Sequence, residues 1–313
     1  MAEPIAFAAL ALDAVIGWPR ALYARIGHPV GFFARIITLS ERYGNQARWS
    51  AGLRRAIGVL TVMLLLAVSA GGALLLEGLC RRWLGSLAWL GMAILAWPAL
   101  AQRSLFEHVR PIARHLGEGD EARARQDVSM IVGRDTETLD EPGIARAAIE
   151  SLSESFCDGV AAPLFWLIVG GLPGIWAYKA INTADSLIGH KEERWRAFGW
   201  AAARTDDVMN FLPARLGGAV ICLAGGGGWR IMWRDARKHA SPNAGWTEAA
   251  MAGTLGLRLA GPVSYDGVAH DKPWIGEGRD RVFAQDIQRA LRVYLRACAI
   301  LWIGAAAMPL LIR

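Results

Sequence analysis

Two long runs without charge constrain this chain more than any other feature of its sequence. Ala56 to Leu76 and Trp83 to Gln102 contain no acidic or basic side chain. Each run is close to the roughly 20 residues that an α-helix needs to cross the hydrocarbon core of a bilayer. Hydrophobic residues make up 54% of the 313-residue chain, which is high for a soluble domain. The sequence therefore predicts a membrane protein with spans at about 56–76 and 83–102.

Three further apolar segments, at about 159–178, 208–229 and 297–312, extend the predicted membrane contact. The first contains Gly-Gly-Leu-Pro-Gly at 170–174, a sequence that breaks a regular helix. Because lipid cannot satisfy the freed backbone groups, this segment is expected to be a broken or re-entrant helix packed against protein. The other two segments are shorter, and each fits a tilted span, a buried helix or an interfacial helix. The sequence predicts four to six membrane segments.

The polar parts of the chain are also expected to be helical. Leu105, Val109, Ile112 and Leu116 recur at the spacing of an amphipathic helix, and no convincing strand alternation occurs. No Pro/Ser-rich linker, low-complexity run or internal repeat marks a domain boundary. The predicted fold class is all-α: a polytopic integral membrane protein with cytoplasmic helical regions and possible re-entrant helices, in a single domain of residues 1–313.

The charges of the loops predict the orientation. Between Trp18 and Arg55 there are seven arginines against one acid, Glu41, and the positive-inside rule places this loop in the cytoplasm. The polar region from Arg103 to Asp158 then lies on the same side. The net charge of +6 is spread over such loops, so it favours anionic membrane lipid over nucleic acid as a partner. We expect a multi-pass protein of the cell (inner) membrane with its site on the cytoplasmic side.

Several familiar site patterns are absent from the sequence. The four cysteines never form a C-x-x-C pair, so neither a zinc site nor a disulfide framework is indicated. No P-loop, Rossmann glycine fingerprint, H-E-x-x-H or G-x-S-x-G motif occurs. The candidate chemistry must therefore come from four clusters of acids, amides and basic residues.

The first cluster follows Pro142, which is typical of the start of a helix. Arg146, Glu150, Glu154 and Asp158 succeed one another at four-residue spacing on one helix face. Three acids in such a row repel each other by roughly 0.2–0.5 kcal/mol per pair. The row is either an ordinary solvated face or a surface that binds a cation or substrate at the membrane boundary.

The second cluster follows the segment at 159–178. Asn182, Asp185, Ser186 and Gly189 fall on one helical face, one turn after Lys179. This face is either decoration at the level of the lipid headgroups or a ligand surface, in which the glycine leaves room for a ligand to approach.

The third cluster is Arg-Thr-Asp-Asp-Val-Met-Asn at 204–210. In a helix, Asn210 shares a face with at least one of Asp206 and Asp207. Adjacent acids beside a membrane need a positive partner. That partner is either Mg²⁺, which binds through one or two carboxylates plus phosphate oxygens, or an arginine, Arg204 or Arg215.

The fourth cluster, Ser241 to Gly267, begins with the turn sequence Ser-Pro-Asn and is rich in glycine. It predicts a compact loop, helix and loop with little side-chain bulk. Such a segment could either wrap a large rigid ligand or form an ordinary packed connection.

Seven sequence stretches together resemble a known family. They are HPV at 28–30, VGRDT at 132–136, DGVAAPLF at 158–165, AYKAINTADSLIGHK at 177–191, FGWAAARTDDVMNFLPARL at 198–216, SPNAGWTEAAMAGTLGLRLAGP at 241–262 and KPWIG at 272–276. In this order they resemble the adenosylcobinamide-phosphate synthases, the CobD/CbiB family of cobalamin biosynthesis. Two positions depart from the family pattern: Trp18 stands where Asp is usual, and Ser155 stands where the family usually has Asn.

The resemblance implies an integral membrane enzyme that consumes ATP with Mg²⁺. Its reaction would join the amine of aminopropanol phosphate, or of a related amino-alcohol phosphate, to a carboxylate of adenosylcobyric acid. Other enzymes of the corrinoid pathway are possible partners. The alternatives are an intramembrane Mg²⁺-dependent prenyl or phospho-alcohol transferase, and a membrane scaffold or transporter without enzymatic activity.

Under this resemblance the clusters acquire roles, which we state as hypotheses. The residues expected to hold Mg²⁺ are Asp185, Asp206 and Asp207. The residues expected to take part in catalysis, with Glu150 or Glu154 as the general base, are Glu150, Glu154, Asp158 and Lys179. The residues expected to bind substrate, through phosphate groups or the amide-rich rim of the corrin, are Arg134, Asp135, Asn182, Lys191, Arg204, Asn210 and Asn243.

Overall fold

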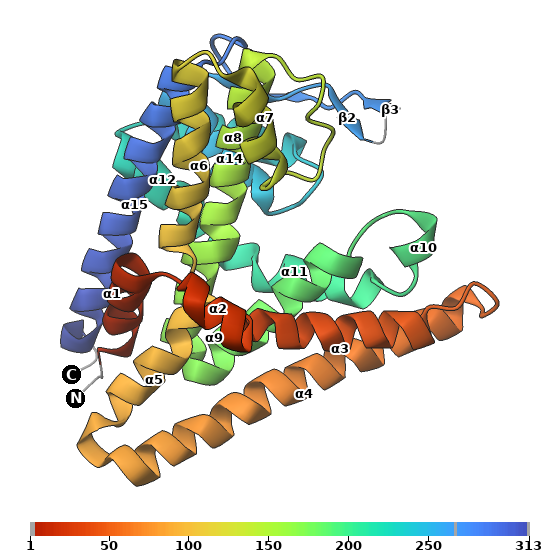
Figure 1. Cartoon of the computed structure of the whole chain (residues 1–313), viewed down its shortest axis with the longest axis vertical. Coiled ribbons are helices and arrows are strands. Elements are labelled where there is room, and N and C mark those ends of the chain that lie inside the picture. The colour runs from red at the N-terminus through yellow and green to blue at the C-terminus, as the bar shows by residue number, and fades with distance from the viewer. Residues whose placement is uncertain (1–3, 266–267, 312–313) are drawn as a thin grey trace. The chain divides into compact units, whose positions relative to one another are not determined.

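The computed structural model describes residues 4–265 and 268–311, and nearly all of the regular structure in them is helical (Figure 1). The all-α fold class is therefore confirmed. Contacts group the chain into two compact units, each assembled from separated segments. The first unit takes its described residues from Met1–Ala101, Ala162–Asn210 and Ala305–Arg313, and the second from Gln102–Ala161 and Phe211–Gly304.

The first unit is built from long helices. They are α1 (Ile5–Ile16), α2 (Arg20–Ile26), α3 (Pro29–Gly44), α4 (Ala51–Leu84), α5 (Ala88–Ala96), α9 (Ala162–Ile188), α10 (Glu193–Arg196) and α11 (Trp200–Met209), with 3-10 turns at Gly85–Leu87 and Trp97–Ala99. Helix α4 packs against α3, α9 and α11, and Figure 1 shows α3 and α4 as long neighbouring helices. At Gly58 on α4 a Cβ atom would lie 1.9 Å from the Phe198 carbonyl oxygen, so only glycine permits this close approach.

Helix α9 is broken at the place that the sequence indicated. Gly171 has φ 60° and ψ −152°, which is not a helical conformation, and Pro173 follows it inside the element. A Cβ atom at Gly174 would lie 2.3 Å from the Trp166 carbonyl oxygen. The predicted broken helix within 159–178 is therefore confirmed, because glycine and proline separate two helical halves.

The second unit combines helices with two small two-stranded sheets. Its helices are α6 (Gln102–Gly117), α7 (Glu121–Ser129), α8 (Glu141–Phe156), α12 (Phe211–Gly225), α13 (Trp229–Asp235), α14 (Ala244–Leu255) and α15 (Ala284–Leu311) as far as Gly304, with a π-helical turn at Cys157–Ala161 and a 3-10 turn at Ala236–Lys238. Its strands are β1 (Arg258–Ala260), β2 (Val263–Tyr265), β3 (Val268–His270) and β4 (Trp274–Gly276). Strand β1 pairs antiparallel with β4, and β2 with β3. The strands are three residues long, too short for an alternating pattern to predict them.

Helix α8 shows why these residues form a helix. The Asp140 side chain caps it by accepting a hydrogen bond of 2.9 Å from the Gly143 N–H, and Pro142 lies in the first turn. The apolar face of the helix, on which Ile144, Ala148 and Leu152 recur at four-residue spacing, is buried, with each of the three side chains 0% exposed. Because this face is buried inside the second unit, the polar face of α8 is available for a site.

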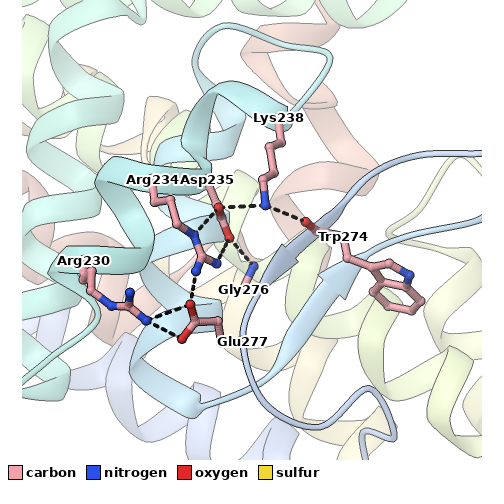
Figure 2. A network of polar contacts seen from close by, with 7 residues as sticks. All are labelled: Arg230, Arg234, Asp235, Lys238, Trp274, Gly276 and Glu277. Carbon is pink, nitrogen blue, oxygen red and sulfur yellow. Dashed lines mark hydrogen bonds and ion pairs between the residues drawn. The ribbon is translucent and has the colours of Figure 1, made fainter.

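A network around Asp235 holds strand β4, which pairs with β1 (Figure 2). The Asp235 carboxylate, which is 0% exposed, accepts hydrogen bonds from Arg234 Nε at 2.7 Å and from the Gly276 N–H at 2.9 Å. Lys238 Nζ lies 2.8 Å from Asp235 Oδ1, and Glu277 forms an ion pair with Arg234. Burial alone would raise the pKa of Asp235, but the hydrogen bonds from Arg234, Lys238 and Gly276 outweigh it and hold the pKa below its usual range.

Three helical stretches are long and apolar enough to cross a membrane: Ala51–Gly117, Glu141–Ile188 and Ala284–Met308. Two bent helix pairs, α1 with α2 and α11 with α12, raise this number to five among the residues that the structure describes. The predicted span at 56–76 lies within α4, and the segment at 297–312 overlaps α15. The segment at 83–102 is interrupted, because Gly85 has φ 54° and Pro98 lies in a second 3-10 turn, Trp97–Ala99.

Candidate functional site

The second unit contains a cavity of about 170 Å³ whose walls carry charges of both signs. We call it the charged pocket and define it by its ionisable lining residues, which are Arg134, Glu150, Glu154, His239, Glu248 and Lys272. The glutamates come from α8 and α14, and Arg134 comes from the loop between α7 and α8. Three residues predicted for the site, Arg134, Glu150 and Glu154, therefore meet in one pocket.

Glu150 is a fully engaged carboxylate. Its Oε2 atom accepts a short hydrogen bond from Arg134, and its Oε1 atom accepts a hydrogen bond of 2.7 Å from the Ala260 N–H. Arg146, one turn earlier on α8, lies 3.8 Å from the same Oε1 atom. Because both oxygens have strong donors, the Glu150 carboxylate is held in a fixed position.

The donor to Glu150 sits in unusual backbone geometry. Ala260 has φ 56°, in the left-handed region that side-chain-bearing residues seldom adopt. Such a conformation costs of order 1–3 kcal/mol and persists only where the surroundings enforce it. Two contacts hold Ala260 in place. Ala260 on β1 pairs with Trp274 on β4, and Gly276, also on β4, donates its N–H to Asp235.

Glu248 on α14 closes the opposite wall of the charged pocket. Its side chain is 5% exposed, and its Oε2 atom lies 3.6 Å from His239 Nε2. Its Oε1 atom is buried and has no hydrogen-bond partner among the described residues. A buried carboxylate oxygen without a donor is costly, and it points to a ligand, an ion or a proton at this position.

The electrostatics of the pocket favour the protonated form of Glu248. Burial raises the pKa of Glu248 well above its usual range, and the negative charges of Glu150 and Glu154 raise it further. Arg134 and Lys272 oppose this effect only in part. Glu150 and Glu248 therefore differ in their surroundings, because both oxygens of Glu150 have donors whereas Glu248 Oε1 has none among the described residues.

A second polar cluster lies in the first unit, around Asp206. Asn210 Nδ2 donates to Asp206 Oδ2 at 3.0 Å, and Asn182 Nδ2 lies 3.4 Å from Oδ1. Tyr178 donates to Asn210 Oδ1 at 3.0 Å, and Lys179 Nζ is 3.4 Å from Asn182 Oδ1. We call these five residues the carboxamide network. The prediction that Asn210 shares a face with an aspartate is confirmed, and the network also joins two helices, α9 and α11.

The other two predicted metal ligands have different surroundings. Asp207 Oδ2 lies 3.0 Å from Arg204 Nη1, and the two residues form an ion pair between positions three residues apart on α11. At Gly189 a Cβ atom would lie 1.9 Å from Asp185 Oδ1, so this carboxylate fills the space that the sequence suggested for a ligand. Among residues 4–265 and 268–311 no group of three or more His, Cys, Asp or Glu side chains could hold a metal ion.

The remaining predicted site residues lie outside the charged pocket. Asp158 falls in the π-helical turn Cys157–Ala161, and it is not among the residues that line the charged pocket. Asn243 is 5% exposed and its Oδ1 atom accepts a hydrogen bond of 3.3 Å from Arg215. Asp135 follows Arg134 in the loop before α8, and Lys191 follows the end of α9.

Trp18, one of the two departures from the family pattern, lines a separate cavity of about 520 Å³ in the first unit. Aromatic and aliphatic side chains, including Phe33, Trp97 and Trp176, surround it. Since its lining contains no ionisable side chain, this cavity cannot supply acid, base or phosphate-binding groups.

Sequence reasoning missed three members of the charged pocket: His239, Glu248 and Lys272. Glu248 lies in the glycine-rich fourth cluster and Lys272 in the stretch KPWIG, but the sequence assigned neither residue a function. Spacing rules relate residues within one helix, whereas Glu248 meets Glu150 only through the packing of α14 against α8.

The helices and the charged pocket define an all-α membrane protein with a buried ionic site. The chain belongs to the CobD/CbiB family, since a sequence model of that family, described as CobD/Cbib protein, matches residues 6–294. Curated relatives named "Cobalamin biosynthesis protein CobD" support the same family assignment. The protein from Rhodobacter capsulatus is 48% identical over 93% of this chain and 92% of its own length. Those from a Sinorhizobium species and from Rhizobium meliloti strain 1021 are 46% and 43% identical, over 94% and 97% of this chain and 94% and 96% of their own lengths. No solved structure matches the chain.

Proposed function

We propose that this chain is an adenosylcobinamide-phosphate synthase of cobalamin biosynthesis. It joins the amine of aminopropanol phosphate, or of a related amino-alcohol phosphate, to a propionate carboxylate of adenosylcobyric acid, and it consumes ATP. The observation that carries the proposal is the charged pocket, in which three glutamates face Arg134 and Lys272. Such a pocket suits an amine that must lose a proton before it attacks and a phosphate group that needs cationic partners.

The chemistry requires activation because a carboxylate is a poor electrophile. In the first step a carboxylate oxygen of the corrinoid attacks the γ-phosphorus of ATP, which forms an acyl phosphate and releases ADP. In the second step the amine nitrogen attacks the acyl carbon, the carbon–oxygen bond to phosphate breaks, and inorganic phosphate leaves. A base takes the proton that the ammonium loses before attack.

The three glutamates then have different functions. Glu150, held by Arg134 and the Ala260 N–H, keeps the pocket in shape. Glu154 and Glu248 are the candidates for the base. The raised pKa of Glu248 favours it for this step, because a carboxylate with a raised pKa is a stronger base than an ordinary glutamate. Glu248 thereby replaces Asp158 in the set inferred from sequence.

Phosphoryl transfer depends mainly on positioning and on neutralising charge. Mg²⁺, bound together with ATP, would neutralise the phosphate oxygens. The donor set fits, since Mg²⁺ typically takes one or two protein carboxylates plus phosphate oxygens. Consecutive residues on a helix point about 100° apart, so Asp206 and Asp207 would each offer a carboxylate separately rather than chelate one ion. The candidates to steady the phosphates are Lys179, Lys191 and Arg204.

The carboxamides are assigned by their contacts. Asn182 and Asn210 are 7% and 2% exposed and contact Asp206, so in this proposal they orient Asp206. Asn243 remains the candidate for contact with the amide-rich rim of the corrin. We place the protein in the cell (inner) membrane in several passes, in contact with lipid and with its site in the cytoplasm. The reason is that the segment from Trp18 to Arg55, which comprises α2, α3 and the start of α4, contains seven arginines and one acid.

Purified protein in detergent, supplied with adenosylcobyric acid, aminopropanol phosphate and Mg-ATP, tests the reaction. We expect adenosylcobinamide phosphate and ADP in equal amounts. The double variant Asp206→Asn with Asp207→Asn should lose turnover but still insert in membranes, whereas the exposed control Asp280→Asn should keep it. Turnover of a prenyl diphosphate without loss of ATP would overturn the proposal in favour of a transferase, and an inert wild-type protein would favour a scaffold.

A further inference from the structure

We infer that the charged pocket of the second unit binds the small amino-alcohol phosphate, with the ammonium group at Glu248 and Glu154 and the phosphate group at Arg134 and Lys272. This inference rests on the proposed reaction, and it assigns one of the three substrates to one pocket. Four properties of the pocket support it: its size, its charges, its unpartnered acceptor and the rigidity of its wall.

The size of the pocket selects among the substrates. A cavity of about 170 Å³ is smaller than the roughly 300–1,000 Å³ that sites for drug-sized ligands occupy. The nucleotide and the corrin are therefore too large for the pocket to enclose. An amino alcohol of two or three carbons with one phosphate group is the only substrate of the proposed reaction that fits within this volume as a whole.

The charges of the pocket match both ends of that molecule. An amino-alcohol phosphate carries an ammonium group and a phosphate group separated by a short carbon chain. The lining of the pocket offers two carboxyl groups, Glu154 and Glu248, and two basic side chains, Arg134 and Lys272. A guanidinium has five N–H donors in a planar fork, so Arg134 can bind a phosphate while it keeps its hydrogen bond to Glu150.

The buried Oε1 atom of Glu248 indicates where the ammonium group lies. Among the described residues this oxygen accepts no hydrogen bond, although its side chain is 5% exposed and lines the cavity. An ammonium group has three N–H donors and no acceptor. Its arrival would supply the missing donor and a compensating charge, and it would place the nitrogen next to the group that is to take its proton.

The wall opposite α14 is preorganised. Glu150 is tied to the left-handed Ala260, and the Ala260 strand is tied to Asp235 through Gly276. A small ligand gains affinity from such a site because few groups have to be ordered when it binds.

Calorimetric titration of the full-length protein in detergent with ethanolamine phosphate tests the assignment. We expect saturable binding to the wild type, and a loss of affinity of about tenfold or more for Glu248→Gln and for Lys272→Gln, since each removes a charge-assisted contact. The control Glu277→Gln, whose side chain is 48% exposed and lies outside the pocket lining, should bind like the wild type.

Two partial probes separate the ends of the ligand. Binding of inorganic phosphate should weaken with Lys272→Gln and be insensitive to Glu248→Gln, and binding of ethanolamine should show the opposite pattern. No binding of ethanolamine phosphate to the wild type, or equal affinities for all variants, would overturn the inference. If Glu248→Gln fails to fold, the Lys272→Gln result alone decides.

The amide-forming assay distinguishes this inference from the reaction itself. In Lys272→Gln the KM for the amino-alcohol phosphate should rise about tenfold or more while the KM for ATP stays unchanged. Amide formation with both KM values unchanged would refute the pocket assignment and leave the reaction standing. Specific binding of ethanolamine phosphate without any amide formation would support the pocket and refute the reaction.

Discussion

Replacement of Asp235 by asparagine tests the role of the network in Figure 2. Oδ1 faces Arg234 Nε at 2.7 Å and Lys238 Nζ at 2.8 Å, and Oδ2 faces Arg234 Nη2 at 2.6 Å and the Gly276 N–H at 2.9 Å. Whichever way the new carboxamide is turned, its NH₂ group meets two donors. The substitution therefore removes a buried charge and also creates a conflict between hydrogen-bond donors.

The magnitude follows from the burial of the partners. Loss of one partner of a buried ion pair costs about 3–5 kcal/mol. We expect the lower end of this range, about 3 kcal/mol, because the Arg234 and Lys238 side chains are 38% and 41% exposed and can be hydrated again. At roughly 2 °C per kcal/mol for a chain of this size, Tm should fall by about 6 °C.

The assay is thermal unfolding of the purified protein in detergent at pH 7, followed by circular dichroism. The matched control is Glu277→Gln, which removes a carboxylate from the same network at a side chain that is 48% exposed. A surface ion pair contributes about 0–1 kcal/mol, so the control should lower Tm by less than about 2 °C. Equal shifts for Asp235→Asn and Glu277→Gln would refute the reasoning from burial.

The pH dependence gives the same test a second readout. The folded-state pKa of Asp235 is lowered, so its carboxylate contributes stability above the ordinary pKa of about 3.9, and this contribution is lost as the pH falls toward the folded pKa. The difference in Tm between wild type and Asp235→Asn should therefore be constant from pH 8 to pH 5 and shrink below about pH 4.

Three further predictions follow from other features. Gly58→Ala should destabilise the first unit by about 1–3 kcal/mol because its Cβ would meet the Phe198 carbonyl oxygen at 1.9 Å, whereas Gly71→Ala, with open space around it, should be near neutral; thermal unfolding compares them. The raised pKa of Glu248 contributes stability that is fully present below its unfolded pKa of about 4.3 and is lost as the pH rises through the folded pKa. Glu248→Gln should therefore become more stable relative to the wild type between pH 5 and pH 8, by about 1.4 kcal/mol for each pH unit between pH 5 and the folded pKa. Unfolding curves at both pH values that show no relative gain would contradict this. Chelation of Mg²⁺ by EDTA should stop amide formation, and added Mg²⁺ should restore it; full turnover in EDTA would remove the metal from the proposal.

Local features of the fold were predictable from the sequence because they depend on neighbours along the chain. The cap and proline at the start of α8, the break of α9 at Gly171 and the buried face that includes Ile144 all follow from helical spacing and from residue types. The contact of Asn210 with Asp206 follows in the same way, since the two residues are four positions apart on one helix.

The composition of the charged pocket could not be predicted in this way. Glu248 reaches Glu150 and Glu154 through the packing of α14 on α8, and helical spacing says nothing about contacts between helices so far apart in the chain. The left-handed conformation of Ala260 could not be predicted for a different reason. Alanine has no preference for this conformation, and the hydrogen bond to Glu150 and the pairing with Trp274 impose it. The π-helical turn that contains Asp158 could not be predicted either, because such a turn is not evident in a row of evenly spaced residues.

The interleaved segments of the first unit affect the order in which the protein can be assembled on the ribosome. Helix α4 packs against α9, but about 80 residues separate the end of one from the start of the other, which at 5–20 residues per second corresponds to several seconds of translation. During this interval α4 must be accommodated by the insertion machinery or by lipid without its main neighbour. A ribosome stalled between residues 101 and 162 would therefore carry a nascent chain whose first unit is incomplete, and protease protection of such a stalled chain would report how α4 is sheltered.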